Sequence, residues 1–236
     1  MSFEQIFEAG VKSFQGKDFA KATDYFSQAL TLRPDDPSVL TNLALSHYEL
    51  DQKVPAYVYF KKALHVAPDN FQAQQGFEFL QSQVQVRDIP HQIEFYEKAR
   101  SLLVTPISGH VPFALSWVLF IAVGYRGIGY LSRRRQAYLS GEDKPSFGLI
   151  NFALAFFFIA SLSWSLFHSY DRSLQRGLVK DDTVVIRSAP SMGGPALLEL
   201  NGGLEVRILR KQDGWIQVQY PGSYSGWLQK DSIVEL

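Results

Sequence analysis

The amino-acid sequence predicts a multi-domain α plus β membrane protein, with an α-solenoid of helical repeats, a two-helix transmembrane hairpin and a small β-barrel. Three observations lead to this prediction. The first part of the chain repeats itself with a spacing of 34 residues, two central stretches are long and almost free of charge, and the last part alternates apolar and polar residues between turn signals. Such patterns are typical of a helical solenoid, of membrane spans and of an antiparallel sheet.

The 34-residue spacing relates positions that pack helices together. Small alanines let two helices approach closely, a phenylalanine fills the space between them, and a proline ends the second helix. These pairs are Ala22 and Ala56, Phe26 and Phe60, Ala29 and Ala63, and Pro34 and Pro68. The pattern resembles the tetratricopeptide repeat, whose further signature positions are filled by Gly10, Leu43 and Ala44.

A third, less regular copy is expected to complete the repeat domain. Phe71, Phe77 and Leu80 suit its first helix, and Tyr96, Ala99 and Leu102 suit its second helix after a two-residue insertion. Solenoids of this type need about three units to bury a continuous core. We therefore predict a repeat domain over residues 1–105.

The resemblance implies a protein-binding groove, because such repeats bind peptides or helices on the concave surface formed by the first helix of each pair. Only Asn42 matches the clamp that grips carboxylate tails in chaperone-binding members, so an apolar helix or strand is the expected ligand. The alternative, that these side chains only pack between repeats, stays open. The predicted groove residues are Phe7, Val11, Phe14, Asn42, Leu45, Tyr48, Gln75 and Phe79.

Two apolar stretches predict membrane spans. Residues 147–167 contain no charge, and 21 residues of helix reach about 30 Å, the thickness of the hydrocarbon core. The first span and its approach, residues 106–131, are apolar from Val111 onward except for Arg126. A charge inside a span is a candidate functional residue, but Arg126 lies near the end of its span, so we expect its side chain to extend toward the interface.

The loop predicted between the spans, residues 132–146, determines the expected topology. It contains Arg133, Arg134, Arg135 and Lys144, and short basic loops stay in the cytoplasm. We therefore expect a multi-pass protein of the bacterial inner membrane with both folded domains in the periplasm. The sequence opens without a basic and apolar leader, so we also expect an upstream signal that is missing or processed. The alternatives are that the first span carries the N-terminal domain across the membrane, or that the charge rule fails for this loop.

After a linker over residues 168–179, residues 180–236 predict a small β-barrel. Short β-branched or aromatic runs alternate with Gly, Pro and Asp-Gly turns, and landmarks such as Asp213-Gly214-Trp215 and Gly226-Trp227 resemble the bacterial SH3 domain. That resemblance implies binding of peptide or cell-wall glycan. Four aromatic residues are expected to offer a stacking surface, although Trp215 and Trp227 also suit the barrel core. The four are Trp215, Tyr220, Tyr224 and Trp227.

Nothing in the sequence indicates catalysis, a cofactor or a metal. The chain has no cysteine, and its 23 basic and 23 acidic residues give no basic face for nucleic acid. Phosphate-binding, nucleophile-elbow and zinc-protease motifs are missing. The neighbouring His91 and Glu94 are better interpreted as a surface pair than as a metal site.

The order of repeats, span, basic loop, span and SH3-like domain resembles the Bat aerotolerance family over almost the whole chain. That resemblance implies a non-enzymatic scaffold that partners membrane proteins with von Willebrand factor A domains and is functionally linked to MoxR-type ATPases in envelope stress. The alternative is a cell-wall sensor whose SH3-like domain binds peptidoglycan.

Overall fold

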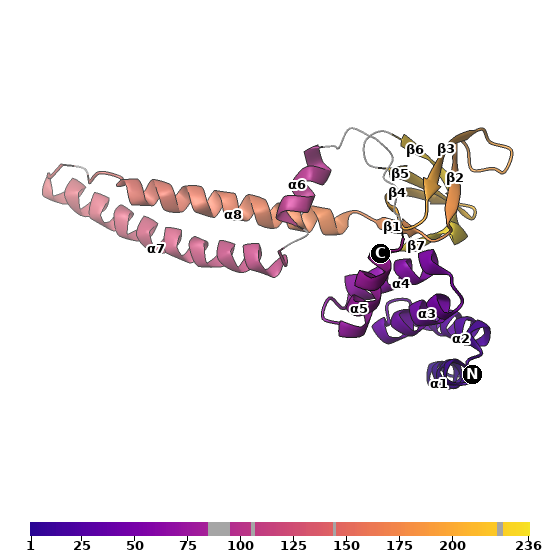
Figure 1. The fold of residues 1–236 in the computed structure, drawn as a ribbon. Helices are drawn as coiled ribbons and strands as arrows, with labels where there is room; N and C mark the ends of the chain where they lie inside the picture. The colour runs from indigo at the N-terminus through magenta and orange to yellow at the C-terminus, as the bar shows by residue number, and fades with distance from the viewer. Residues whose placement is uncertain (85–94, 105–106, 144, 221–223) are drawn as a thin grey trace. The chain divides into compact units, whose positions relative to one another are not determined.

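The computed structural model (Figure 1) describes residues 1–84, 95–104, 107–143, 145–220 and 224–236. The chain forms two compact units, one made of Met1–Gln92 with Gln175–Leu236 and the other of Ile93–Leu174. The first unit is therefore discontinuous in sequence. The two units are described separately below.

The first unit begins with five helices: α1 (Phe3–Gln15), α2 (Phe19–Leu32), α3 (Pro37–Glu49), α4 (Lys53–Val66) and α5 (Phe71–Gln81). Polar residues cap four of these helices at the N-terminus. The side chains of Ser2, Asp18, Asp36 and Asn70 accept hydrogen bonds from backbone N–H groups of the first turn. The short segments between capped helices make successive helices pack as antiparallel neighbours.

The alanine and phenylalanine positions of the repeat form the helical core. Phe26 and Phe60 are 0% and 1% exposed, and Ala22, Ala29, Ala56 and Ala63 are fully buried. The ring of Phe26 lies against Gly10, where an added Cβ atom would stand 2.7 Å from its Cε1 atom, and the ring of Phe60 lies still closer to the position of a Cβ atom added at Gly76. The region is thus built of tetratricopeptide-like helical repeats, as the spacing predicts.

The segment expected to form the second helix of the third repeat is helical. α6 (Phe95–Leu103) belongs to the second unit, whereas α5 belongs to the first. Tyr96 of α6 packs its ring on Phe167 and Tyr170 of α8 (Leu149–Ser173). Tyr96 therefore packs on α8, whereas Leu102 is 66% exposed, and the assignment of Tyr96, Ala99 and Leu102 to a repeat helix stays a prediction. Thr105, the predicted end of the repeat domain, lies outside the described residues.

The second unit also contains α7 (His110–Ser140), which packs along α8 as a hairpin (Figure 1). Both helices are long and apolar enough to cross a membrane, and only 11% of the most apolar window of each is buried. Ser116 and Ser161 meet between them at 3.3 Å, and Arg126 Nε donates to Asn151 Oδ1 at 2.7 Å. The Arg126 side chain thus has a partner on the other helix, a contact that the sequence did not indicate.

The predicted loop 132–146 is helical as far as Ser140, because α7 continues beyond the apolar stretch. Arg133, Arg134 and Arg135 therefore lie on the last turns of α7. The helix ends at Gly141, whose φ of 72° is the left-handed conformation that glycine adopts readily. Lys144 lies outside the described residues.

The C-terminal part of the first unit is a seven-stranded antiparallel sheet in the order β3-β2-β6-β5-β4-β1-β7. Alternate residues of its strands form one core, which includes Ile186, Val206, Ile216, Val218 and Leu228. The predicted linker 168–179 is instead the end of α8 followed by β1. The strands are β1 (Arg176–Val179), β2 (Thr183–Arg187), β3 (Ala196–Asn201), β4 (Glu205–Gln212), β5 (Trp215–Tyr220), β6 (Tyr224–Gln229) and β7 (Ile233–Glu235).

Within the first unit, the sheet packs against the repeat helices. Leu178 of β1 and Val234 of β7 belong to the same buried cluster as the repeat core. The Glu205 carboxylate accepts from Lys61 Nζ of α4 at 3.2 Å and from Arg176 Nη1 of β1 at 3.3 Å. This carboxylate therefore joins the repeats to the sheet.

Candidate protein-binding surfaces

The predicted groove corresponds to the surface formed by α1, α3 and α5, the first helix of each repeat, and α3 contacts both α1 and α5. Within α1, Phe7 is half-buried between Phe3 and Phe26, with ring centroids 6.0 and 5.6 Å away. Phe14 packs edge-on against Phe19 at 5.2 Å. Much of the surface of these rings, and of the half-buried Val11, is buried in packing between helices.

The other end of the groove is more open. Tyr48 of α3 and Phe79 of α5 make an edge-to-face pair at 5.8 Å, and Phe79 remains 52% exposed. Gln75 is exposed beside it, and Leu45 is half-buried. Phe71, which the sequence assigned to the first helix of the third copy, is 69% exposed. An apolar patch of α3 and α5 is thus available to a partner.

Asn42 has its amide turned toward its own helix. Its Nδ2 donates to the backbone oxygen of Ser38 at 2.8 Å, which leaves the side-chain oxygen to accept. A carboxylate clamp requires hydrogen-bond donors. The half-buried Asn42 has only the second N–H of its side-chain amide left to donate to a ligand. The geometry favours an apolar ligand over a charged peptide tail.

A second hollow of the first unit, of about 760 Å³, surrounds His47. The His47 ring stacks on Tyr59 with centroids 5.4 Å apart, and its Nδ1 lies 2.6 Å from Gln52 Oε1. Burial lowers the pKa of His47 and raises that of Tyr59, so both groups favour their neutral forms. Lys180 and Asp181 also line this hollow, so that its wall carries one positive and one negative side chain at these positions. The sequence did not single out this site, because its residues come from distant segments.

The aromatic residues of the SH3-like domain do not share one surface. Trp215 and Trp227 lie on the outer face of β5 and β6 and are half-buried, whereas Tyr220 points into the core and is 3% exposed. Tyr220 is therefore removed from the predicted stacking surface, because it has the opposite strand parity from Trp215. Nothing is described for the Tyr224 side chain.

Trp215 lines a shallow cavity of about 270 Å³ on the domain. Arg187, Met192 and Gln229 line it too, and Arg187 Nη1 is held by the Gly194 oxygen at 2.9 Å. An indole face beside a fixed guanidinium and an amide can stack on and hydrogen-bond to a peptide or a sugar. The sequence indicated the tryptophan but not its neighbours Arg187, Gln229 and Met192, which come from β2, β6 and the loop after β2.

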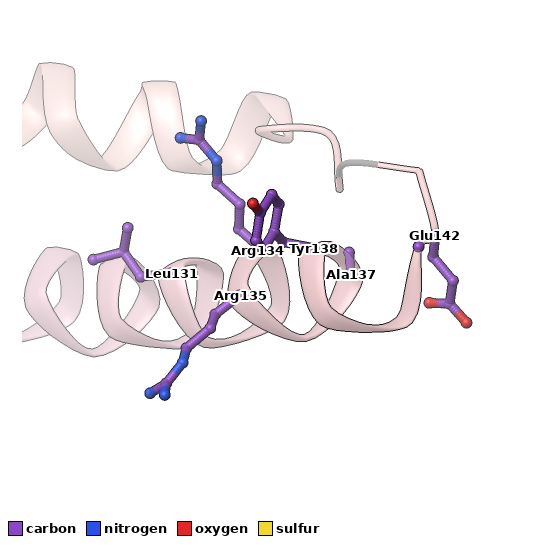
Figure 2. Close-up of a pocket in the computed structure, with 7 residues that line it drawn as sticks. Leu131, Arg134, Arg135, Ala137, Tyr138 and Glu142 are labelled. Atoms are coloured by element: carbon purple, nitrogen blue, oxygen red, sulfur yellow. The ribbon is translucent and has the colours of Figure 1, made fainter.

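The basic end of α7 borders an open cavity of about 620 Å³ in the second unit. Figure 2 shows that Arg134 and Arg135 extend to opposite sides of the helix. Arg133 Nε donates to the Gly129 oxygen of the preceding turn at 3.3 Å. Because three consecutive helical residues point in different directions, these charges do not converge on one ligand. They match a helix end surrounded by water or lipid headgroups.

The part of the chain that the structure describes contains no group of three or more His, Cys, Asp or Glu side chains that could hold a metal ion. His91 and Glu94 lie outside the described residues.

Comparison with known proteins identifies the C-terminal module. The bacterial SH3 domain family matches residues 182–234. No curated protein sequence matches the chain.

Solved structures with a similar fold contain helical repeats. The TPR domain of Arabidopsis OM64 is 20% identical, with a TM-score of 0.22 over 35% of this chain and 96% of that one. The first TPR domain of Spaghetti (RPAP3), bound to an HSP90 peptide, is 16% identical, with a TM-score of 0.22 over 34% and 91%. A Bacteroides ovatus protein described as protein binding is 16% identical, with a TM-score of 0.20 over 73% and 85%. At these TM-scores none of the three supports a statement about ligands.

The chain thus combines two kinds of module, tetratricopeptide-like repeats and a bacterial SH3 domain.

Proposed function

We propose that the protein is a membrane-anchored scaffold that holds protein partners through its repeats and its SH3-like domain. The observation that supports anchoring is the exposure of α7 and α8. A soluble core helix of comparable length would be mostly buried, whereas the apolar windows of these two are only 11% buried. Exposed apolar surface of this extent is stable in lipid and costly in water.

The packing of the first unit supports a hairpin topology. The repeats precede α7 and the SH3-like domain follows α8, yet both share one buried cluster through Leu178 and Val234. Two domains in contact must lie on one side of a membrane, which requires an even number of spans between them. The arginines near the C-terminal end of α7 support a location of the two domains outside the cytoplasm, by the positive-inside rule.

The exposed apolar patch around Tyr48 and Phe79 supports a protein ligand for the repeats. The order of the modules is similar to protein E of the Bat aerotolerance family. We therefore propose that the partner is a membrane protein with a von Willebrand factor A domain, in an envelope-stress complex.

Two experiments test this proposal. Because the chain lacks cysteine, single cysteines at the exposed positions Ser27, Ser140 and Ser191 can be labelled in intact spheroplasts with an impermeant maleimide. Labelling at positions 27 and 191 but not 140 is expected, and the reverse pattern would place both domains in the cytoplasm.

A photo-crosslinking amino acid at Phe79 then tests the groove. We expect it to capture a membrane protein with a von Willebrand factor A domain, identified by mass spectrometry, whereas the same group at Ser27 on α2 does not. Equal capture from both positions, or capture of unrelated proteins only, contradicts the proposed partner.

Cell-wall binding by the SH3-like domain is the second candidate, favoured by the cavity that Trp215, Arg187 and Gln229 line. Here the full-length protein in detergent would sediment with purified peptidoglycan. The change Trp215→Ala would abolish sedimentation, whereas Gln217→Ala, on the same strand and face, would not. Sedimentation that survives Trp215→Ala rules out this site.

A further inference from the structure

The short helix α6 is fixed to the C-terminal end of α8, and Figure 1 shows the two crossing there. The Asp171 carboxylate, 8% exposed, accepts from Tyr96 Oη at 2.6 Å and pairs with Arg100 Nε at 3.1 Å. The backbone oxygen of Leu103 accepts from Trp164 Nε1 at 2.9 Å and from His168 Nε2 at 3.0 Å. Both ends of α6 are therefore attached to α8 by polar contacts.

A different face of α6 is apolar and uncovered within the described residues. Phe95, Ala99 and Leu102 follow one another at the i, i+4 and i+7 spacing of a single helix face. Phe95 is 87% exposed, Leu102 66% and Leu103 44%. Ser101 lies on the opposite face and is exposed. The helix is thus amphipathic, and its apolar face does not point at the polar contacts with Asp171.

The position of α6 along α8 indicates what covers this face. Its contacts with α8 run from Trp164 to Asp171, at the end of the apolar stretch 147–167 that spans the hydrocarbon core in the proposed function. Trp and Tyr side chains concentrate at that depth in membrane proteins, and here Trp164 and Tyr170 occupy it.

We propose that α6 is an interfacial helix that lies in the lipid headgroup layer, with Phe95 and Leu102 inserted toward the acyl chains. This inference rests on the proposed membrane insertion of α7 and α8. Short amphipathic helices with Phe and Leu on one face bind at this depth. The Asp171 cluster holds the helix against α8, so the chain leaves the repeats through a segment fixed to the bilayer surface.

Spin labels on single cysteines test the inference in the full-length protein, reconstituted in phosphatidylcholine and phosphatidylglycerol vesicles. The labelled positions are Phe95, Leu102 and Ser101 of α6, together with the exposed Val118 of α7 as a reference inside the span. Collision rates with oxygen, which partitions into lipid, are compared with those of a water-soluble nickel chelate. We expect labels at 95 and 102 to favour oxygen by several-fold over the label at Ser101.

The outcomes separate this inference from the proposed function. If labels at 95 and 102 are as accessible to nickel as the label at Ser101, while Val118 favours oxygen, α6 lies in water and the inference is wrong. If Val118 also favours nickel, the proposed spans fail first. If both reagents are excluded at 95 and 102, protein covers the face and the lipid proposal is overturned. Two independent apolar positions keep the test valid if one variant fails to fold.

Discussion

The Glu205 carboxylate offers a sharp test of how the repeats and the SH3-like domain are held in one unit. Its two oxygens each serve a different cation, Lys61 at 3.2 Å and Arg176 at 3.3 Å. The change Glu205→Gln keeps the size of the side chain but replaces one oxygen with an amide donor. One cation then faces an N–H group, and neither faces a negative charge.

The cost follows from the burial of the three groups. Exposure of the side chains is 8% for Arg176, 21% for Glu205 and 29% for Lys61, so solvent screens the pair with Lys61 more than the pair with Arg176. A hydrogen bond to a charged group is worth about 1.5–3 kcal/mol, and screening removes part of the second bond. We expect a loss of about 2 kcal/mol, equal to about a 30-fold change in an opening equilibrium.

Hydrogen exchange with mass spectrometry can measure this opening in the full-length protein. Peptides that cover β1 and α4 are expected to exchange about 30-fold faster in Glu205→Gln, because local opening governs exchange. Glu199→Gln is the matched control, since it removes the same charge from an exposed position on β3 of the same domain. Equal exchange in the two variants would refute the assignment of Glu205 as the joining group.

Three further predictions concern stability. Gly10→Ala should destabilise the repeats by about 1–2 kcal/mol in thermal melts, because overpacking against the buried Phe26 outweighs the gain in helix propensity; a neutral result would show that the ring can move. Gly226→Ala should prevent folding of the SH3-like domain, since its Cβ atom would overlap Ile186 and stand 2.7 Å from the Arg187 oxygen; native tryptophan fluorescence in this variant would contradict the packing. Burial lowers the pKa of His47 below 6.5 in the fold, so its contribution to stability is complete above about pH 6.5 and lost as the pH falls below that value. The melting temperature of His47→Gln should therefore depend less on pH than that of the unchanged protein between about pH 7.5 and about pH 5, and an unchanged slope would exclude His47 as the cause.

The sequence predicted those parts of the fold that follow from a regular spacing of apolar residues along the chain. The 34-residue spacing placed Phe26 and Phe60 in a helical core, and strand alternation in the C-terminal region predicted an SH3-like domain; both are confirmed. The same reasoning did not indicate that Tyr96 packs on α8, because an apolar helix face shows that a packing partner exists without showing which one. It also missed Glu205, since a contact across 144 residues leaves no local pattern.

The candidate sites show a similar division. The sequence indicated Trp215 as an aromatic residue of the SH3-like region, whereas Arg187 and Met192 join it only after the strands have paired. Tyr220 was misplaced because composition does not distinguish the two sides of a strand. Counting strand parity from Trp215 would have assigned it to the core.

The discontinuity of the first unit has a consequence for biosynthesis. The surface of α4 that receives the sheet is made early, but Leu178 and Val234 leave the ribosome only after both long helices. Until then the apolar surface of α4 in the nascent chain is not covered by the sheet, and a chaperone or an early-binding partner can occupy it. The SH3-like domain is thus the last part of the first unit to be synthesised. Chains that stop after α8 would leave the apolar surface of α4 permanently exposed.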